Sequence, residues 1–329
     1  MKKTLLAIAT ALSAIAVTQA QNISAVSESG ETTIYQTFDE AITEAPAGST
    51  IYLPGGGFTH NDNVTITKRL TIMGVSHRAD TDNADGATTV TGRLRLENGS
   101  DGTTIIGIYL GGDIVIGGSG TYNHVVNNVT LRYVNINSVY VGHSKCSGLV
   151  INQSYLRSQS QFNSTNAKIT NCVTHHIMQL NGGVIDHSIV YCSSYNSSGF
   201  HVNGLDAEQS NITNNILIDT FGPINNNGIT TNNCVGSGEW GDNPVKMEEG
   251  QSWENIFVAH KGITPASDYH LSTSFGKNAD TNGGEIGLYG GTGFNDAALA
   301  PIPRIVAKTI PEQTDASGKL KISVTVKSN

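Results

Sequence analysis

A column of side chains at matching positions of a repeated pattern is the best candidate for contacting a ligand. Its members are Arg95, Val115, Tyr140, Gln161, Gln179, His201 and Pro223. Apolar residues flank most of these positions, so in β-strands the flanking residues point inward and the column points outward. Tyr140 offers a ring for the face of a sugar, while the glutamines and His201 offer hydrogen bonds. The column is a candidate carbohydrate-binding surface, although an ordinary solvated face of polar residues is the favoured interpretation of its composition.

Several side chains near this column could bind or cleave a polysaccharide. β-Elimination of an acidic polysaccharide needs a base beside the sugar C–H and a cation beside the uronate carboxylate. The catalytic candidates are Lys145, His143 and His201. The carbohydrate-binding candidates are Tyr140, Gln161, Gln179, His201 and Asp206. Hydrolysis would need two carboxylates across a glycosidic bond, and no clustered Asp motif of that kind is present. Whether the protein is an enzyme is left open, with a lyase favoured over a glycoside hydrolase.

The sequence predicts no metal site and no cofactor. A Ca²⁺ ion bound on the column would need acidic side chains from adjacent repeats, whereas Asp206 and Glu208 come from one segment. The neighbouring repeats supply Asn or Ser at that position, so Ca²⁺ is kept only as an alternative. His175 and His176 are adjacent, and successive residues of a strand face opposite ways, so we do not expect them to share a zinc ion.

A repeat of about 21 residues between Val139 and Val235 must position these side chains. Each period has one apolar segment ending in Gly or Asn and a second that begins with Ile. The first segments are Val139–Gly142, Gln161–Asn163, Met178–Asn181, Phe200–Asn203 and Pro223–Asn225. We expect pairs such as Met178/Leu180 and Phe200/Val202 to stack inside a solenoid. The asparagines that end the segments, with Asn152, Asn171, Asp186 and Asn214 in the second ones, are expected in left-handed corners with amide ladders.

The N-terminal part adds a cap. Residues Phe38–Ile42 have helical apolar spacing, and Pro46-Ala47-Gly48 ends the helix before the strand Ser49–Pro54. With the run Val64–Gly74, this part resembles the cap and first coil of right-handed parallel β-helix proteins of the pectin-lyase-like superfamily. The resemblance covers roughly residues 30–295 and implies an all-β right-handed parallel β-helix, three short strands per coil, with a short N-terminal capping helix. In such proteins the outward strand face forms the sugar groove.

Three regions are expected along the chain. Residues 1–20 have the basic start, apolar run and small-residue end of a secretory signal peptide. The β-helix with its cap takes residues 21–295, and residues 296–329 form a Pro-containing linker and a C-terminal β-hairpin tail. The Tyr-Gly-Gly ending followed by this tail resembles exported β-helix proteins of Bacteroidetes-type bacteria. We expect an exported protein, located in the periplasm, on the cell surface or outside the cell.

The composition of the chain excludes some classes of binding partner. The formal charge is −8, and it becomes −10 once Lys2 and Lys3 leave with the signal. An acidic chain without basic clusters argues against nucleic acid and anionic membranes, and no second long apolar run predicts a transmembrane segment. The four cysteines fall at positions that adjacent coils would not align, so free buried thiols are expected.

Two functions of different classes therefore remain. The first is a secreted protein that binds a polysaccharide or cell-surface glycan along one outward sheet face, with cleavage by β-elimination as an open possibility. The second is a non-catalytic surface or envelope scaffold, similar to an adhesin. The neutral Asn, Ser and Thr surface and the absence of an acidic stack favour the second. Neither the glycan nor the oligomeric state can be predicted from the sequence.

Overall fold

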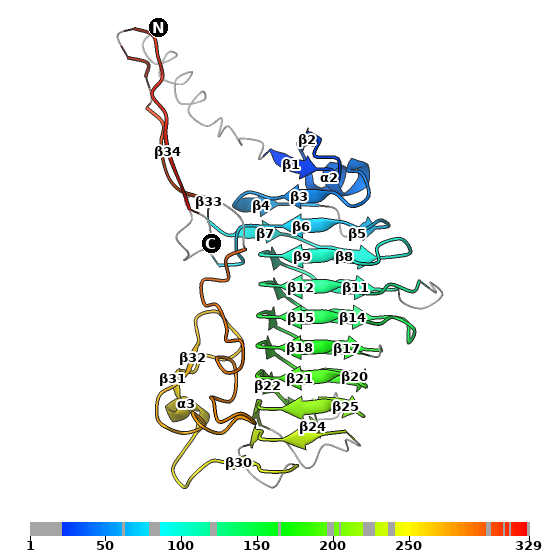
Figure 1. Cartoon of the computed structure of the whole chain (residues 1–329), viewed down its shortest axis with the longest axis vertical. Coiled ribbons are helices and arrows are strands. Elements are labelled where there is room, and N and C mark those ends of the chain that lie inside the picture. Colours follow the sequence, from blue (N-terminus) through cyan, green and yellow to red (C-terminus); the bar gives the residue numbers. More distant parts are fainter. Residues whose placement is uncertain are drawn as a thin grey trace, which may run out of the picture.

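The computed structural model describes residues 22–60, 63–78, 86–118, 124–163, 166–195, 201–203, 205–219, 228–235, 241–300, 304–311, 313–315 and 317–327. The predicted signal peptide lies outside these residues, as do Phe200 and Pro223 of the repeat. Within them the chain is nearly all β, and most strands belong to three long sheets. The coils stack on one another into a single β-helix, with the N-terminal cap at one end (Figure 1).

Each coil contributes one strand to each of three sheets, here called A, B and C. Sheet A has the order β2 (Thr32–Tyr35), β1 (Ile23–Val26), β3 (Thr50–Tyr52), β6 (Thr71–Met73), β9 (Thr104–Ile106), β12 (Thr130–Arg132), β15 (Val150–Asn152), β18 (Lys168–Thr170), β21 (Val184–Asp186), β26 (Asn211–Thr213) and β28 (Thr230–Thr231). Apart from β1 and β2, all these strands pair in parallel.

Sheets B and C complete the coils. Sheet B consists of β4 (Gly56–Phe58), β7 (Thr88–Val90), β10 (Tyr109–Leu110), β13 (Asn135–Ile136), β16 (Tyr155–Leu156), β19 (Val173–Thr174), β22 (Ile189–Tyr191), β27 (Ile216–Ile218), β29 (Cys234–Val235) and β30 (Val245–Lys246). Sheet C consists of β5 (Asn63–Ile66), β8 (Arg93–Leu96), β11 (Ile114–Ile116), β14 (Val139–Val141), β17 (Ser160–Phe162), β20 (Ile177–Asn181) and β25 (Leu205–Glu208). The predicted parallel β-helix with three short strands per coil is confirmed.

The interior is a set of stacked apolar columns. In sheet A, Ile151 pairs with Ile169, Ile169 with Ile185, and Ile185 with Ile212, and none of these side chains is exposed. Because alternate residues of a strand face opposite ways, the same register sends the residues beside each isoleucine to the outer face. The core thus fixes which side chains the outer faces present.

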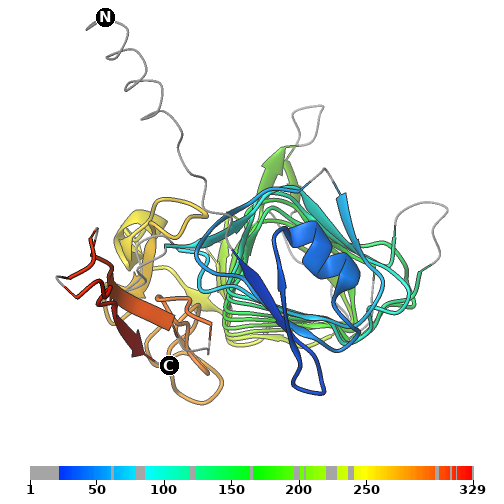
Figure 2. The same ribbon diagram turned by 90° about the horizontal axis from the view of Figure 1, so that it is seen from above.

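The capping helix α2 (Phe38–Glu44) covers the N-terminal end of the column, as predicted (Figure 2). Thr37 starts the helix with a capping box, in which its hydroxyl accepts from the Glu40 N–H and the Glu40 carboxylate accepts from the Thr37 N–H. Phe38, Ala41 and Ile42 are buried against the first coil. The helix therefore removes from water the apolar end that an open solenoid would expose.

The region after β30 differs from the expected last coils. Helix α3 (Trp253–Ile256) and the antiparallel strands β31 (Phe257–Ala259) and β32 (Asp268–Leu271) pack beside the column rather than below it (Figure 1). Phe257, Tyr269 and Leu271 join a second apolar core with outward side chains of sheet B. These outward side chains are Tyr155, Val173, Ile189, Ile216, Ile218 and Cys234. The strands of sheet B that carry these side chains are thus covered on their outer face as well as on their inner face. This covering is needed because these strands have apolar residues on both faces.

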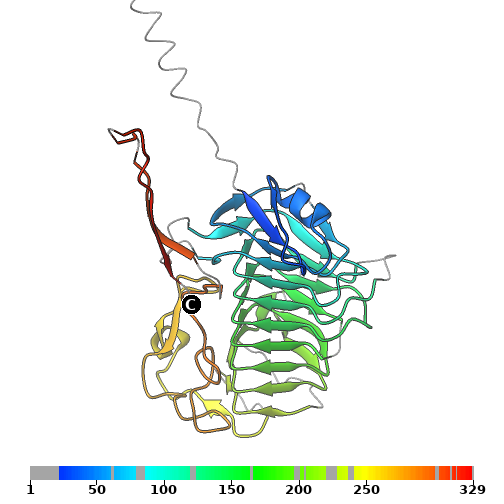
Figure 3. The ribbon, with the colours of Figure 1, turned by 45° about the horizontal axis from the view of Figure 1, so that its top comes forward.

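Residues 279–300, here called the strap, return along the corner between sheets A and B (Figures 1 and 3). At one end Asn232 donates its side-chain N–H to Ala279 O (2.8 Å), and at the other Ala300 N–H donates to Val75 O (3.0 Å). Midway, Asn171 Nδ2 lies 2.9 Å from the carbonyl oxygens of both Leu288 and Gly290. The segment Gly287–Gly291, which contains the Tyr-Gly-Gly sequence predicted to end the β-helix, therefore lies along the side of the coils.

The corner between sheets A and B has left-handed residues, as predicted, but only some of them are the predicted ones. Asn171 and Asn214 adopt the expected left-handed conformation, with φ of 50° and 59°, but Asn152 and Asp186 do not. The residues after them, Gln153 and His187, take that conformation instead. The predicted left-handed corner in the first segment is also wrong, because the described asparagines there do not have positive φ. An amide ladder does occur one position further along, where Asn215 Nδ2 donates to Asn233 Oδ1 (3.0 Å).

His187 joins the strap to the coils through two carboxylates. Its Nδ1 lies 2.8 Å from Asp186 Oδ2, and its Nε2 lies 3.4 Å from Asp280 Oδ2. Burial disfavours the imidazolium, but hydrogen bonds to Asp186 and Asp280 and their negative charges outweigh burial and raise the pKa of His187. Burial likewise opposes ionisation of Asp280, yet N–H groups of Gly284 and Asn282, followed by His187, lower the pKa of that carboxyl.

The strap should be held most firmly in mildly acidic solution. Charged His187 contributes stability that is complete below its ordinary pKa of 6.5 and is lost as pH rises through the raised value. The two aspartates contribute above 3.8 and lose their contribution as pH falls. Asp280→Asn should lower the free energy of unfolding by roughly 3 kcal/mol at about pH 6 and lower the pH at which the histidine contribution fades.

Urea denaturation across a pH series, with hydrogen exchange at the strap amides, measures both effects. Asp268→Asn is the matched control, since its carboxylate is 45% exposed and belongs to another pair. An Asp280→Asn protein with the stability profile of the unsubstituted chain would show that this ion pair does not hold the strap.

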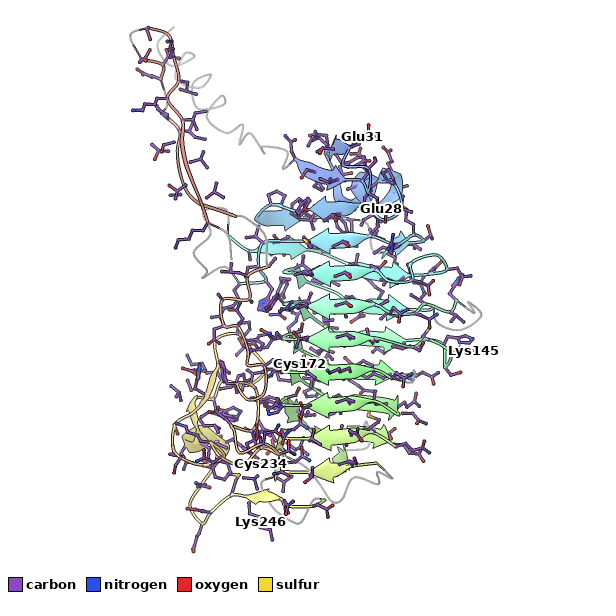
Figure 4. All side chains as sticks on the ribbon, viewed as in Figure 1. Glu28, Glu31, Lys145, Cys172, Cys234 and Lys246 are labelled. Atoms are coloured by element: carbon purple, nitrogen blue, oxygen red, sulfur yellow. The ribbon has the colours of Figure 1, made fainter. Side chains whose placement is uncertain are left out.

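All four cysteines are free and buried, as expected. Figure 4 labels two of them, Cys172 and Cys234. Burial raises the pKa of the Cys172 and Cys234 thiols to about 12. Because the thiolate is the reactive species, the native protein should resist alkylation by iodoacetamide at neutral pH and become fully labelled in denaturant. Mass spectrometry of the labelled protein measures this. Rapid native labelling of Cys172 would contradict the buried position in the coil.

Candidate functional site

The outer face of sheet C carries the first part of the predicted column. Val115 pairs with Arg95 on one side and with Tyr140 on the other, and Tyr140 pairs with Gln161. These four side chains therefore lie in adjacent strands at the same height along each strand. These side chains are 20, 25 and 21 residues apart along the chain, and the apolar residues beside each of them allowed the sequence to align them.

The column changes at strand β20. Gln161 pairs with Met178, not with Gln179, and Ile177 and Leu180 are the buried residues. The prediction that Met178 points inward is therefore wrong. Gln179 has φ of 56° and occupies an irregularity in the pairing of β20 with β25. Its side chain still reaches the column, because Gln161 Nε2 donates to Gln179 Oε1 at 2.7 Å.

His201 does not belong to sheet C, so its predicted place in the column is wrong. It lies in β24 (His201–Asn203), which pairs antiparallel with β23 (Ser193–Tyr195) in an inserted hairpin. The next segment, β25, supplies the coil's strand, with Leu205 and Ala207 inward and Asp206 outward. Asp206 Oδ2 accepts a hydrogen bond from the Gln179 N–H at 3.2 Å. Asp206 thus continues the column beyond Gln179, as a neighbour of its backbone.

A hollow of about 400 Å³ opens over the middle of this face. It is lined by Arg93, Val115, Tyr140, Val141, Gly142, Gln161 and Asn163. The Val115 side chain is buried and forms an apolar part of the lining, while the Tyr140 residue is 37% exposed. The hollow therefore combines an aromatic ring, an apolar patch and amide groups, which are the features that hold a sugar ring.

Arg93 was missed by the sequence reasoning, although it lies two residues before Arg95 on the same face of β8. Its Nη2 donates to Asp113 Oδ2 at 2.9 Å. The other oxygen, Asp113 Oδ1, accepts from Asn137 Nδ2 (2.8 Å) and from Ser138 Oγ (2.5 Å). Burial disfavours the carboxylate, but Ser138, Asn137 and Arg93 together lower the pKa of Asp113. The guanidinium at the hollow is thus held in place and its charge is compensated.

His143 and Lys145 lie on the turn after β14, not in the lining of the hollow. Lys145 N–H donates to His143 Nδ1 at 3.1 Å, and Figure 4 shows Lys145 at the outer edge of the column of coils. His143 and Lys145 therefore share a turn, whereas His201, the third catalytic candidate, lies in the inserted hairpin. Arg95 lies beside Val115 on the neighbouring strand β8. It forms no ion pair among the described residues, in contrast to Arg93, so its positive charge is not compensated by a carboxylate there.

No set of three His, Cys, Asp or Glu side chains in the described part of the chain could hold a metal ion. His175 and His176 do not face opposite ways as expected, because their rings stack 4.1 Å apart. Burial, together with the neighbouring His176, lowers the pKa of His175 to about 4. His175 is therefore neutral at physiological pH. No helix among the described residues is long and apolar enough to cross a membrane.

A second hollow of about 330 Å³ lies between the β31–β32 hairpin, the strap and Arg78. His270 Nδ1 lies 2.7 Å from Asp268 Oδ1, and the His270 ring stacks on Tyr289 at 3.6 Å. Tyr289 in turn donates its hydroxyl to Asp296 Oδ1 at 2.6 Å. One feature of the sequence could have indicated this cluster, since Asp268 and His270 are two residues apart on a strand and so share a face.

Comparison with known proteins finds no matching family model, no matching curated protein and no matching solved structure. The fold is consequently established by the coils themselves, and the resemblance to the pectin-lyase-like superfamily stays a prediction. The function has to be argued from the geometry of sheet C.

Asp113 should matter for the stability of the hollow at neutral pH. Asp113→Ala leaves Arg93, Asn137 and Ser138 without their acceptor, so we expect a loss of about 2 kcal/mol in the free energy of unfolding. The Asp113 contribution is present above pH 3.8 and is lost as pH falls through the lowered pKa. Urea denaturation at neutral pH and at about pH 2.5 measures it. A difference between the two proteins that persists undiminished in acid would contradict the role of the carboxylate charge.

Proposed function

We propose that this protein binds a polysaccharide along the outer face of sheet C, with one sugar ring in the hollow beside Tyr140. The observation that carries the proposal is the half-exposed Tyr140 ring next to a buried Val115 and an exposed row of amides. An aromatic ring buries the apolar face of a sugar, while amides satisfy its hydroxyl groups. The extended face, continuous over several strands, suits a polymer better than a single small molecule.

The amide groups support this proposal because they are already oriented. Gln161 donates to Gln179, so the remaining hydrogen-bonding atoms of both amides are available at fixed positions. Holding two flexible side chains before the ligand arrives reduces the conformational entropy that binding would otherwise cost. Asp206, bonded to the backbone of Gln179, extends the same row by one coil.

Cleavage by β-elimination belongs to the proposal only as a second step to be tested. Arg93 in the hollow is compensated by Asp113, and His143 and Lys145 lie on the turn beyond it. Tyr140 is then the side chain that could accept a proton in the hollow, and Arg95 the cation that could face a uronate. Absorbance of new unsaturated sugar ends, followed with a panel of uronate polymers, is the assay for this step.

The alternative function is a non-catalytic surface or envelope scaffold. The observation that favours it is the C-terminal hairpin of β33 (Arg304–Thr309) and β34 (Ser323–Lys327), which projects from the coils with exposed apolar side chains. Such a hairpin suits attachment to another surface better than catalysis. The two functions are compatible, because sheet C and the hairpin occupy different parts of the molecule (Figure 3).

Tyr140→Ala should weaken glycan binding by about tenfold, which corresponds to ~1.4 kcal/mol of lost ring contact. Tyr140→Phe keeps the ring and should retain most of the affinity. A glycan array identifies the ligand, and isothermal titration calorimetry with that ligand measures the change. Lys168→Ala, on the outer face of sheet A, is the matched control and should bind normally.

Two outcomes would count against the proposal. Absence of binding to every glycan on the array, together with no product in the elimination assay, would leave sheet C without a carbohydrate role. Binding that survives Tyr140→Ala but fails in Lys168→Ala would place the glycan on another face.

A further inference from the structure

The C-terminal hairpin, β33 with β34, is an incomplete sheet. Within the described residues it pairs with no third strand, so both of its outer edges are open. Its exposed large apolar side chains are Ile310, Leu320, Ile322, Val324 and Val326, each at least 45% exposed. A two-stranded hairpin is marginally stable in water on its own and normally needs a third strand or a packed face. This hairpin therefore has the features of a segment that completes another sheet.

The body of the molecule has an open edge of the matching kind. Strand β2 is the terminal strand of sheet A and pairs only with β1 among the described strands. Thr32, Thr33 and Ile34 are exposed along it, with Ile34 51% exposed. An exposed edge with an apolar β-branched residue is a template for an additional strand. Addition of a strand at β2 would lengthen a sheet that already has 11 strands.

The N-terminal cap region that contains β2 and the C-terminal hairpin region have opposite net charge. Residues 22–60, which contain β2 and the cap, hold Glu28, Glu31, Asp39, Glu40 and Glu44 and no Lys or Arg. Residues 304–327 hold five basic residues, Arg304, Lys308, Lys319, Lys321 and Lys327, against Glu312 and Asp315. Glu31, directly before β2, forms no ion pair within the described residues, whereas Glu28 pairs with Arg69. Figure 4 shows Glu28 and Glu31 at the capped end of the molecule. Opposite net charge on the two segments favours contact between them and disfavours hairpin-to-hairpin contact.

We propose that the C-terminal hairpin of one molecule adds to the edge of β2 in a second copy of this chain, with β34 as the pairing strand. Backbone hydrogen bonds would supply the affinity, as in other cases of strand addition. Ile34 would gain Val324 or Val326 as a cross-strand neighbour, a contact of two β-branched side chains. Because the two surfaces differ, the contact is heterologous, and it leads to a chain of molecules unless the rotation closes a ring. The proposal is independent of glycan binding.

The test is sedimentation equilibrium of the full chain at protein concentrations up to about 100 µM. An association that needs a higher concentration would be hard to distinguish from non-specific crowding. We expect an average mass well above that of one chain, rising with concentration and falling as salt is added. The double variant Lys321→Glu/Lys327→Glu should return the mass to that of one chain. Glu31→Lys should have the same effect from the other side of the contact.

Combining Glu31→Lys with Lys321→Glu/Lys327→Glu should restore association, which a general loss of folding would not do. Val324→Ser/Val326→Ser should weaken association without altering charge. Lys145→Glu/Lys168→Glu changes the charge equally at two exposed sites remote from the hairpin and should leave the mass unchanged. Circular dichroism of each variant verifies that the coils are folded.

Three results would overturn the proposal. The first is a single-chain mass for the unsubstituted protein throughout the concentration range. The second is association that all the charge variants leave intact. The third is a protein that stays monomeric but co-sediments with vesicles of anionic phospholipid through the same hairpin, because the occupant would then be a membrane surface.

Discussion

Parallel stacking of the coils in register is the constraint on which the rest of the structure depends. Each strand pairs with its counterpart one coil away, so Ile151, Ile169 and Ile185 form a continuous buried column. The neighbours of a side chain are thus decided by the same position in the next coil, not by the residues beside it in the chain. Side chains with distinctive chemistry are consequently found on outer faces, at corners and in inserted segments.

This arrangement buries polar side chains at the corner between sheets A and B, where they need hydrogen-bond partners. Left-handed residues such as Asn171 and His187 repeat at one height of the coil, and their polar side chains are largely buried there. A buried polar group needs a hydrogen-bond partner, and one coil cannot supply it to another at every level. The strap brings backbone carbonyl and N–H groups to this corner, so a single irregular segment satisfies several coils.

The coil period, the capping helix and the terminal hairpin could be predicted because each depends on local spacing of apolar residues. The strand of the coil with the inserted hairpin could not, since His201–Asn203 and Leu205–Glu208 alternate equally well and only pairing with β20 decides between them. The neighbours Tyr140 and Gln161 followed from the period, whereas the Gln179 irregularity did not. The strap was missed because its partners, such as Asn171 and Leu288, are 117 residues apart.

The strap also changes how the stacked coils can unfold. In a simple solenoid each repeat touches only its neighbours, so the ends fray independently of the middle. Here the Ser76 hydroxyl donates to Ala297 O across 221 residues, and other strap residues fasten the coils that carry Gln153, Asn171 and Asn232. Loss of one terminal coil therefore loosens a brace shared with the others, and we expect the coils to unfold together rather than to fray one by one.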